Sequence, residues 1–246
     1  MNKLIPQGLL IAAIFSAIGL VLAYANTQPP PFIYFAVPIG LLVLALLAFV
    51  ATEGWIAGID QFNISIGQYF SWTILLLTLA ICYEVVARYA FHAPTNWAYD
   101  VSYMLYGILF MMGGAYAMAR NGHVRGDFLY RAWPPRTQAR LDLILYFLFF
   151  FPGILALVYS GWDFAKLAYL INERSSASPD GPIIWPFKAI VPVVGVFMML
   201  QGIVEVARCI QCLQTGEWPP RIHDVEEMEK LILDEAEAKR LAEEGR

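Results

Sequence analysis

The amino-acid sequence predicts an all-α integral membrane protein with six transmembrane helices, interfacial helices and a cytoplasmic C-terminal helix. Of the 246 residues, 59% are apolar and 15% are charged, whereas a typical soluble domain has about 45–50% apolar and about 25% charged residues. Six apolar stretches are also long enough to cross a bilayer, because about 20 helical residues span its hydrocarbon core of about 30 Å. So few charged side chains cannot cover the surface of a water-soluble particle of this size.

The six predicted spans are, in chain order, Gly8–Ala25, Phe32–Thr52, Tyr69–Phe91, Val101–Ala119, Leu141–Ser160 and Ile184–Ala207. A helix satisfies its own backbone hydrogen bonds in lipid, so each stretch is expected to be helical. We interpret the first span as a retained helix and not as a signal peptide, because no small-residue cleavage site follows it. The segment Glu53–Gln68 is too polar to span the membrane, and we expect it to lie along the cytoplasmic interface as an amphipathic segment.

Basic residues in the short loops predict the orientation of the spans, because Lys and Arg are retained on the cytoplasmic side. The loop 120–140 contains five arginines, whereas the loops 26–31 and 92–100 contain neither Arg nor Lys. If the loop 120–140 is cytoplasmic, six spans put both termini in the cytoplasm. The seven tryptophans lie near predicted span ends, where indole rings anchor at the membrane surface.

The C-terminal end of the chain is an acidic tail with a helical pattern. Residues 217–246 contain ten Asp and Glu against five Lys and Arg. After Asp224, apolar residues recur at helical spacing, with acidic residues early and Lys239-Arg240 late, as the helix dipole favours. We expect a cytoplasmic helix that is either solvated or a docking surface for another subunit. The rest of the chain has no basic patch of the size that binds nucleic acid.

The third span contains two ionisable residues, Glu84 and Arg88, which need a structural reason because charged groups inside a bilayer are costly. Their i,i+4 spacing, with the acid first, favours an ion pair within the helix. Two further interpretations stay open at this point. Arg88 could also reach Asp100 across the hairpin, or the pair could contact a partner subunit.

The densest polar group follows the fourth span, in the run Arg120-Asn121-Gly122-His123-Val124-Arg125-Gly126-Asp127. Gly122 and Gly126 permit a turn, and Asp127 can cap a short interfacial helix. Arg120, His123 and Arg125 would then face the phosphate headgroups of phospholipids.

Several function classes are excluded by motifs that the sequence lacks. There is no Gly-rich phosphate-binding loop with a Lys, so ATP-driven transport is not expected. The histidines His92, His123 and His223 lie outside the predicted spans, whereas a haem anchor needs axial ligands within them. His, Cys, Asp and Glu do not cluster as in a metal enzyme. We therefore expect no enzymatic activity, no catalytic residue and no metal or cofactor site in this chain.

Three ordered motifs resemble the small membrane subunit of the tripartite ATP-independent periplasmic (TRAP) transporters. They are EVVARYAF at 84–91, Trp97 with Asp100 before an apolar span, and GGAYAMARNGHVRGDFLY at 113–130. The family patterns are approximately Q-V-x-x-R-Y-x-F, W-x-x-E and G-x-H-x-R-x-D-L-L. Glu84 stands where the family often has Gln, Asp100 where it usually has Glu, and Phe128 where Leu is usual.

The resemblance covers about Tyr69–Ala207 and implies a four-helix core. It divides the chain into two additional N-terminal spans with a linker (1–68), the core (69–207) and the acidic helical tail (208–246), as in a longer variant of the small subunit. We expect the motif residues to contact the partner subunit or lipid; they are Glu84, Arg88, Trp97, Asp100, Arg120, His123, Arg125 and Asp127.

The resemblance also implies a function in the bacterial inner membrane. In such transporters a periplasmic solute-binding protein delivers an organic acid to a large membrane subunit, which holds the substrate and sodium sites and moves as an elevator. The small subunit packs against the large one and enlarges its rigid frame, with lipids in the seam. The implied function is the scaffold subunit of a sodium-driven importer of organic acids, with carboxylates such as 2-oxo acids as substrates. Sodium is expected in the large subunit and not in this chain.

Two other functions stay open. A membrane anchor of a respiratory enzyme would bind haem or quinone and would have His pairs in facing spans. An assembly factor without a role in transport would leave solute uptake normal when it is deleted.

Overall fold

The computed structural model of the chain describes residues 40–48, 50, 54–122, 130, 132–178 and 181–219, together with the single positions 7, 9, 11, 12 and 16. The helix predicted after Asp224 and most of the first predicted span therefore lie outside the described residues. Every regular element in the described part is helical, which confirms the prediction of an all-α protein. An isolated β-bridge pairs Arg174 with Ile183 in the connection before the last helix.

The described helices are α3 (Trp55–Ser71), α4 (Thr73–Ala90), α5 (Ala98–Ala119), α7 (Pro135–Leu145), the π-helical η1 (Tyr146–Phe150), α8 (Phe151–Leu170) and α9 (Trp185–Thr215). Trp72 joins α3 to α4, and α7, η1 and α8 run on without a break. Four continuous helices in this part of the chain are therefore long and apolar enough to cross a membrane: 55–90, 98–119, 135–170 and 185–215. They correspond to the third to sixth predicted spans; a total of six spans is not confirmed.

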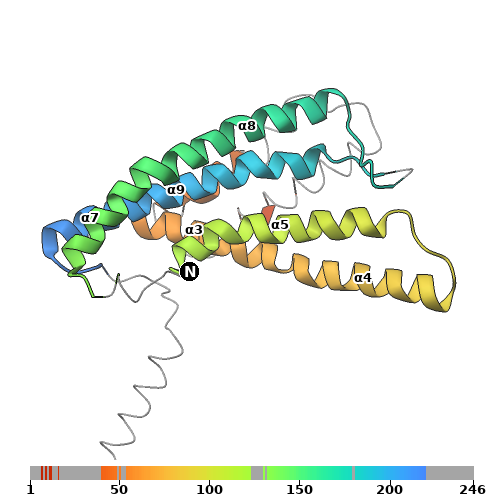
Figure 1. Cartoon of the computed structure of the whole chain (residues 1–246), viewed down its shortest axis with the longest axis horizontal. Coiled ribbons are helices and arrows are strands. Elements are labelled where there is room, and N and C mark those ends of the chain that lie inside the picture. The colour runs from red at the N-terminus through yellow and green to blue at the C-terminus, as the bar shows by residue number, and fades with distance from the viewer. Residues whose placement is uncertain are drawn as a thin grey trace, which may run out of the picture.

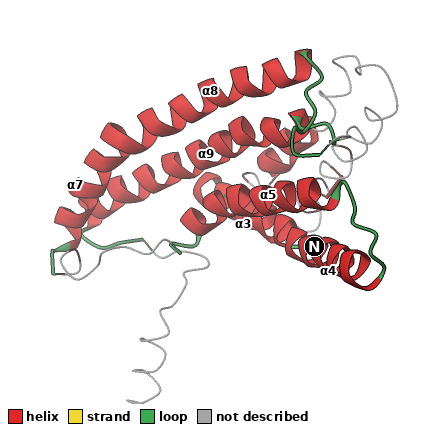
Figure 2. Ribbon diagram, turned by 45° about the vertical axis from the view of Figure 1, so that its right-hand side comes forward, coloured by secondary structure: helices red, strands yellow, loops and turns green. Residues whose placement is uncertain are grey.

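The long helices lie side by side in the order α8, α9, α5 and α4 (Figure 1). Figure 2 shows the same order from another direction, with α3 beside α5. α8 packs along α9, and α4 packs mainly against α5, so α8 and α4 lie on opposite sides of the molecule. We call the exposed surface of η1 and α8 the α8 edge, and the exposed surface of α4 the α4 edge.

The segment before the third predicted span differs from its expected position. It forms most of α3, which continues into α4 and packs against α5 and α9. A separate amphipathic segment along the membrane surface is therefore not confirmed. The buried face of α3 contains Asp60, Asn63 and Ser65 beside Phe62 and Ile66. Polar residues that the sequence placed at the membrane surface are thus enclosed between helices.

The fifth predicted span is shorter than the helix that contains it, because the helix covers 135–170 and the prediction covered Leu141–Ser160. Asp163 and Lys166 follow the predicted end, and both are exposed on α8. Their charges interrupt the apolar pattern without ending the helix. Pro135 occupies the first turn of α7, where its missing N–H costs no helical hydrogen bond.

Small residues allow α8 and α9 to approach each other closely. A Cβ atom on Gly195 would lie 2.5 Å from Val158 Cγ2, and one on Gly161 would lie 3.2 Å from the backbone nitrogen of Pro192. Membrane helices associate through such van der Waals packing, since lipid supplies no hydrophobic driving force between them. A larger side chain at either glycine would push the two helices apart.

The turn after α5 is made by Asn121 and not by the glycine that follows it. Asn121 has a φ of 55°, and the backbone N–H of Gly122 donates to the carbonyl of Ala117 at 2.7 Å. This Schellman arrangement satisfies carbonyl groups at the helix end, and Asn tolerates the left-handed conformation that it requires. Asn172 ends α8 in the same way, with a φ of 50°.

The apolar core lies where α3, α5 and α9 meet. The rings of Phe62 and Phe197 pack edge to face, with centroids 5.6 Å apart. Residues 40–48 are helical, and Ala45 of this segment is fully buried in the same core. The described part of the second predicted span therefore packs against the other helices.

Candidate functional site

The ion pair predicted in the third span forms within α4 and includes a residue of the following turn. Arg88 donates to Glu84 Oε1 through Nε at 2.9 Å and through NH2 at 2.5 Å. Glu84 Oε2 accepts hydrogen bonds from the backbone nitrogen of Thr95, at 3.1 Å, and from its hydroxyl. We call Glu84, Arg88 and Thr95 the hairpin cluster. It fastens the turn between α4 and α5 to the end of α4.

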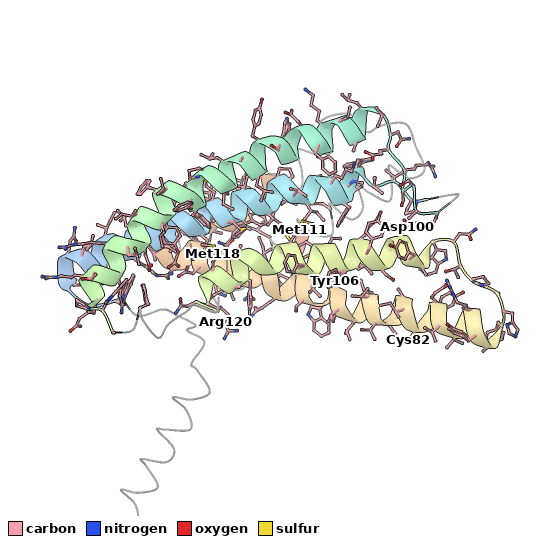
Figure 3. The ribbon with its side chains drawn as sticks, in the orientation of Figure 1. Cys82, Asp100, Tyr106, Met111, Met118 and Arg120 are labelled. Carbon is pink, nitrogen blue, oxygen red and sulfur yellow. The ribbon has the colours of Figure 1, made fainter. Side chains whose placement is uncertain are left out.

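Asp100 does not pair with Arg88, as one interpretation of the sequence proposed. Its carboxylate accepts a hydrogen bond from the Ser175 hydroxyl, because the start of α5 faces the connection between α8 and α9 (Figure 3). Asp100 is 0% exposed and lies in the first turn of α5, where the helix dipole favours a negative charge. Its Oδ2 atom has no hydrogen-bond partner in the described part of the chain.

The connection that supplies Ser175 is held in place at several points. The Ser175 backbone N–H donates to the carbonyl of Pro182 at 2.9 Å. Glu173 forms an ion pair with Lys188 at 2.6 Å, which fastens the connection to the first turn of α9. The Asp100–Ser175 hydrogen bond adds a link to α5. Asp100 therefore joins two helical hairpins that are distant in sequence.

Trp97 immediately precedes α5. Arg120 follows the last residue of the helix, at the end that Figure 3 labels. The Trp97 ring stacks on Tyr83 of α4, with centroids 5.8 Å apart and planes at 25°, and both rings remain exposed. Arg120 NH1 donates to the Tyr116 hydroxyl at 2.6 Å. Trp97 is exposed, and Arg120 is partly buried.

The other three predicted site residues, His123, Arg125 and Asp127, lie outside the described residues. Their contacts with headgroups or with a partner stay predictions. The structure thus brings Glu84 and Arg88 together, and it separates Asp100 from both.

A second polar cluster, which the sequence analysis missed, joins α3 to α9 in the interior. Gln201 accepts a hydrogen bond from Asn63 Nδ2 at 2.8 Å, and its own amide donates to Asp60 Oδ1 at 2.8 Å and to Glu205 Oε1 at 3.3 Å. Arg208 donates to Glu205 at 2.7 Å and forms an ion pair with Asp60. All five side chains are buried. We call them the α3–α9 cluster.

The sequence pattern that predicts this cluster is a row of polar residues along one face of a helix. Gln201, Glu205 and Arg208 follow one another at intervals of four and three residues, so they lie on the same face of α9. Asp60 and Asn63 are likewise one turn apart on α3. Polar residues inside a membrane usually face other helices and find partners there.

Both clusters are arranged to satisfy charged groups within the chain. A buried carboxylate is tolerated when it is paired and hydrogen-bonded, and Arg208 provides this for Asp60 and Glu205 together. Within the described ranges, no three His, Cys, Asp or Glu side chains come together in a way that could hold a metal ion. The role of these hydrogen bonds and ion pairs is structural, because they hold the helices in fixed positions.

Comparison with known protein families extends the resemblance found in the motifs. The model of the family described as "Tripartite ATP-independent periplasmic transporters, DctQ component" matches residues 77–212. This range is more than half of the chain, and it contains α5, α7, η1 and α8 completely, with most of α4 and α9. A search of curated proteins found no match.

Proposed function

The chain belongs to the DctQ component family of tripartite ATP-independent periplasmic transporters, and we propose that it is the scaffold subunit of a sodium-driven importer of organic acids. The matched family is a component of transporters and not an enzyme family, so the chain is the small membrane subunit of a transporter. Membership implies association with a large membrane subunit and a solute-binding protein. The four apolar helices fit a multi-pass protein of the inner membrane.

In this proposal the chain braces the large subunit, which carries the solute and the sodium ions. The observation that supports a bracing role is the α3–α9 cluster, because its side chains bind one another and leave the helices locked together. A helix that moved solute would instead need polar groups that exchange partners during transport. Phospholipids are proposed to fill the seam between the two membrane subunits.

The proposed topology keeps both termini in the cytoplasm, with six spans in total. The arginines of the loop 120–140 support this orientation, since basic loops stay on the cytoplasmic side. The turn with His92 and Thr95 and the connection with Ser175 would then face the periplasm, where the solute-binding protein delivers its load.

Reconstitution tests the proposed function directly. Sealed vesicles that contain both membrane chains, with the solute-binding protein outside, should accumulate a labelled 2-oxo acid when sodium is supplied outside. Omission of this chain should abolish uptake, and replacement of sodium by potassium should do the same. Uptake by vesicles that contain this chain alone would contradict the scaffold role.

Neither alternative function is supported by the family match. Of the three histidines, His92 is the one within the described residues, and it lies exposed in the turn after α4 with a φ of 52°. We therefore do not propose an anchor of a respiratory enzyme, nor an assembly factor.

A further inference from the structure

We infer that the α4 edge is the surface that binds the large membrane subunit, whereas the α8 edge faces lipid. The inference rests on the proposed function, since it takes the large subunit as the partner. It assigns the interface to one of two opposite surfaces that are both rich in exposed apolar side chains. Composition alone does not show which of the two edges is the interface, so we compare their packing and their charge.

Packing shows that α4 is the less supported of the two helices. Leu77 is the single buried residue among the 18 of α4. On α8, Ile154, Gly161, Ala165 and Ala168 are buried, and α9 approaches the helix closely along this row. Because membrane helices are held by side-chain packing, the helix that buries fewer of its residues gains more from an additional neighbour.

Charge points to the same surface. The side chain of Arg88 is 54% exposed, and within the described residues its hydrogen bonds use only Nε and NH2, both to Glu84. A guanidinium group has five N–H donors, so several of them point away from the hairpin cluster. Hydrocarbon tails offer no acceptor, and ionisable residues of membrane helices usually face protein or water. An acceptor on the large subunit would satisfy this group.

The α4 edge also includes Tyr83, which stacks on Trp97 immediately before α5, and both rings are exposed. Arg, Tyr and Trp are enriched in protein interfaces, because each combines a large contact area with hydrogen-bonding capacity. The α4 edge therefore offers both an apolar surface and a polar end that can specify the partner's position.

The α8 edge has the character of a lipid-facing surface. Residues 143–162 contain no Asp, Glu, Lys or Arg. Phe147, Leu148 and Phe149 are exposed there, and hydrocarbon tails solvate such side chains as well as another helix would. A third surface, where α3, α5 and α9 meet, is covered in part by the chain itself through Ala45.

Site-specific photocrosslinking in membranes that contain the whole transporter tests this assignment. Tyr89 on α4 and Tyr159 on α8 are matched positions, because they are the same residue type and each is 74% exposed. Each tyrosine is replaced in turn by a benzophenone amino acid, and the membranes are irradiated. With the benzophenone at position 89, a denaturing gel should show a crosslinked band that contains both this chain and the large subunit. With the benzophenone at position 159, this band should be absent.

Leu79 on α4 and Leu148 of η1, on the α8 edge, form a second matched pair, with 66% and 61% exposure, in case a tyrosine variant assembles poorly. Crosslinks to the large subunit from the two positions on the α8 edge that equal or exceed those from the two α4 positions overturn the inference. Co-purification of the large subunit without irradiation is measured in parallel. Its complete absence overturns the proposed function itself, whereas its presence together with crosslinks only from α8 overturns the interface alone.

Discussion

The α3–α9 cluster and the hairpin cluster contain similar side chains in different surroundings. The first is buried and joins residues 138 to 148 positions apart. The second lies at the exposed end of α4, and its members are at most 11 positions apart. An ion pair between an arginine and a carboxylate therefore has a different role in each place. In the interior it fixes the packing of distant helices, and at the surface it shapes a local turn and leaves an arginine for other contacts.

The largest effect is expected from Arg208→Met, because it leaves Asp60 and Glu205 buried without the cation that both of them contact. Removal of one partner from a buried ion pair costs about 3–5 kcal/mol of stability. Thermal unfolding of the detergent-purified chain, followed by tryptophan fluorescence, should show a large decrease in Tm.

A triple variant provides the control for this prediction. Asp60→Asn and Glu205→Gln, combined with Arg208→Met, remove all three charges, and much of the lost stability should return because neutral replacements of buried pairs are well tolerated. Equal Tm values for Arg208→Met and the unmodified chain would mean that the cluster is not buried as described.

A smaller loss is expected from Ser175→Ala, which removes the hydroxyl that donates to the buried carboxylate of Asp100. An unsatisfied buried acceptor costs about 1–3 kcal/mol. Limited proteolysis should also cleave the connection between α8 and α9 faster. Ser176→Ala is the matched control, since Ser176 is exposed in the same connection and should behave like the unmodified chain.

Trp97→Ala should reduce stability less, because the stacked ring of Trp97 is still 45% exposed. Loss of an aromatic pair costs about 0.5–1.5 kcal/mol beyond the buried area. Its effect on assembly should be more visible, as less large subunit co-purifies. A changed preference among organic acids, measured by uptake competition, would argue against the scaffold role.

The smallest effect on folding is expected from Glu84→Gln combined with Arg88→Met, since an exposed i,i+4 pair adds little stability. Membrane insertion and Tm should remain within the error of their measurement. Retention of the large subunit in gentle detergent should nevertheless decrease. Full retention of the large subunit would show that the hairpin cluster only stabilises the local turn. Both clusters would then have a purely structural role.

The helical fold could be predicted from the sequence because the apolar runs exceed the length that a bilayer requires. The ends of the helices were less predictable, since they depend on contacts between helices. Glu53–Gln68 contains too many polar residues for a lipid-exposed helix, but α5 and α9 enclose those residues and extend the helix to Trp55. Asp163 and Lys166 ended the apolar run, yet their exposed side chains permit α8 to continue to Leu170.

The ion pair between Glu84 and Arg88 could also be predicted from the sequence. Glu84 and Arg88 are one turn apart, so helical geometry alone brings them together. The hydrogen-bond partner of Asp100 is Ser175, which is 75 residues away in the sequence. The spacing of apolar residues within a helix does not predict which distant segment lies beside it. The α3–α9 cluster was missed for the same reason, since Asp60 and Gln201 become neighbours only through tertiary packing.

The continuous helices 55–90 and 135–170 have 36 residues each, which corresponds to a length of about 54 Å at 1.5 Å per residue. The hydrocarbon layer is only about 30 Å thick. α5, with 22 residues, matches that thickness at about 33 Å. The two 36-residue helices are therefore too long to cross the hydrocarbon layer upright, so they must tilt, project beyond it or do both, whereas α5 can cross it nearly upright.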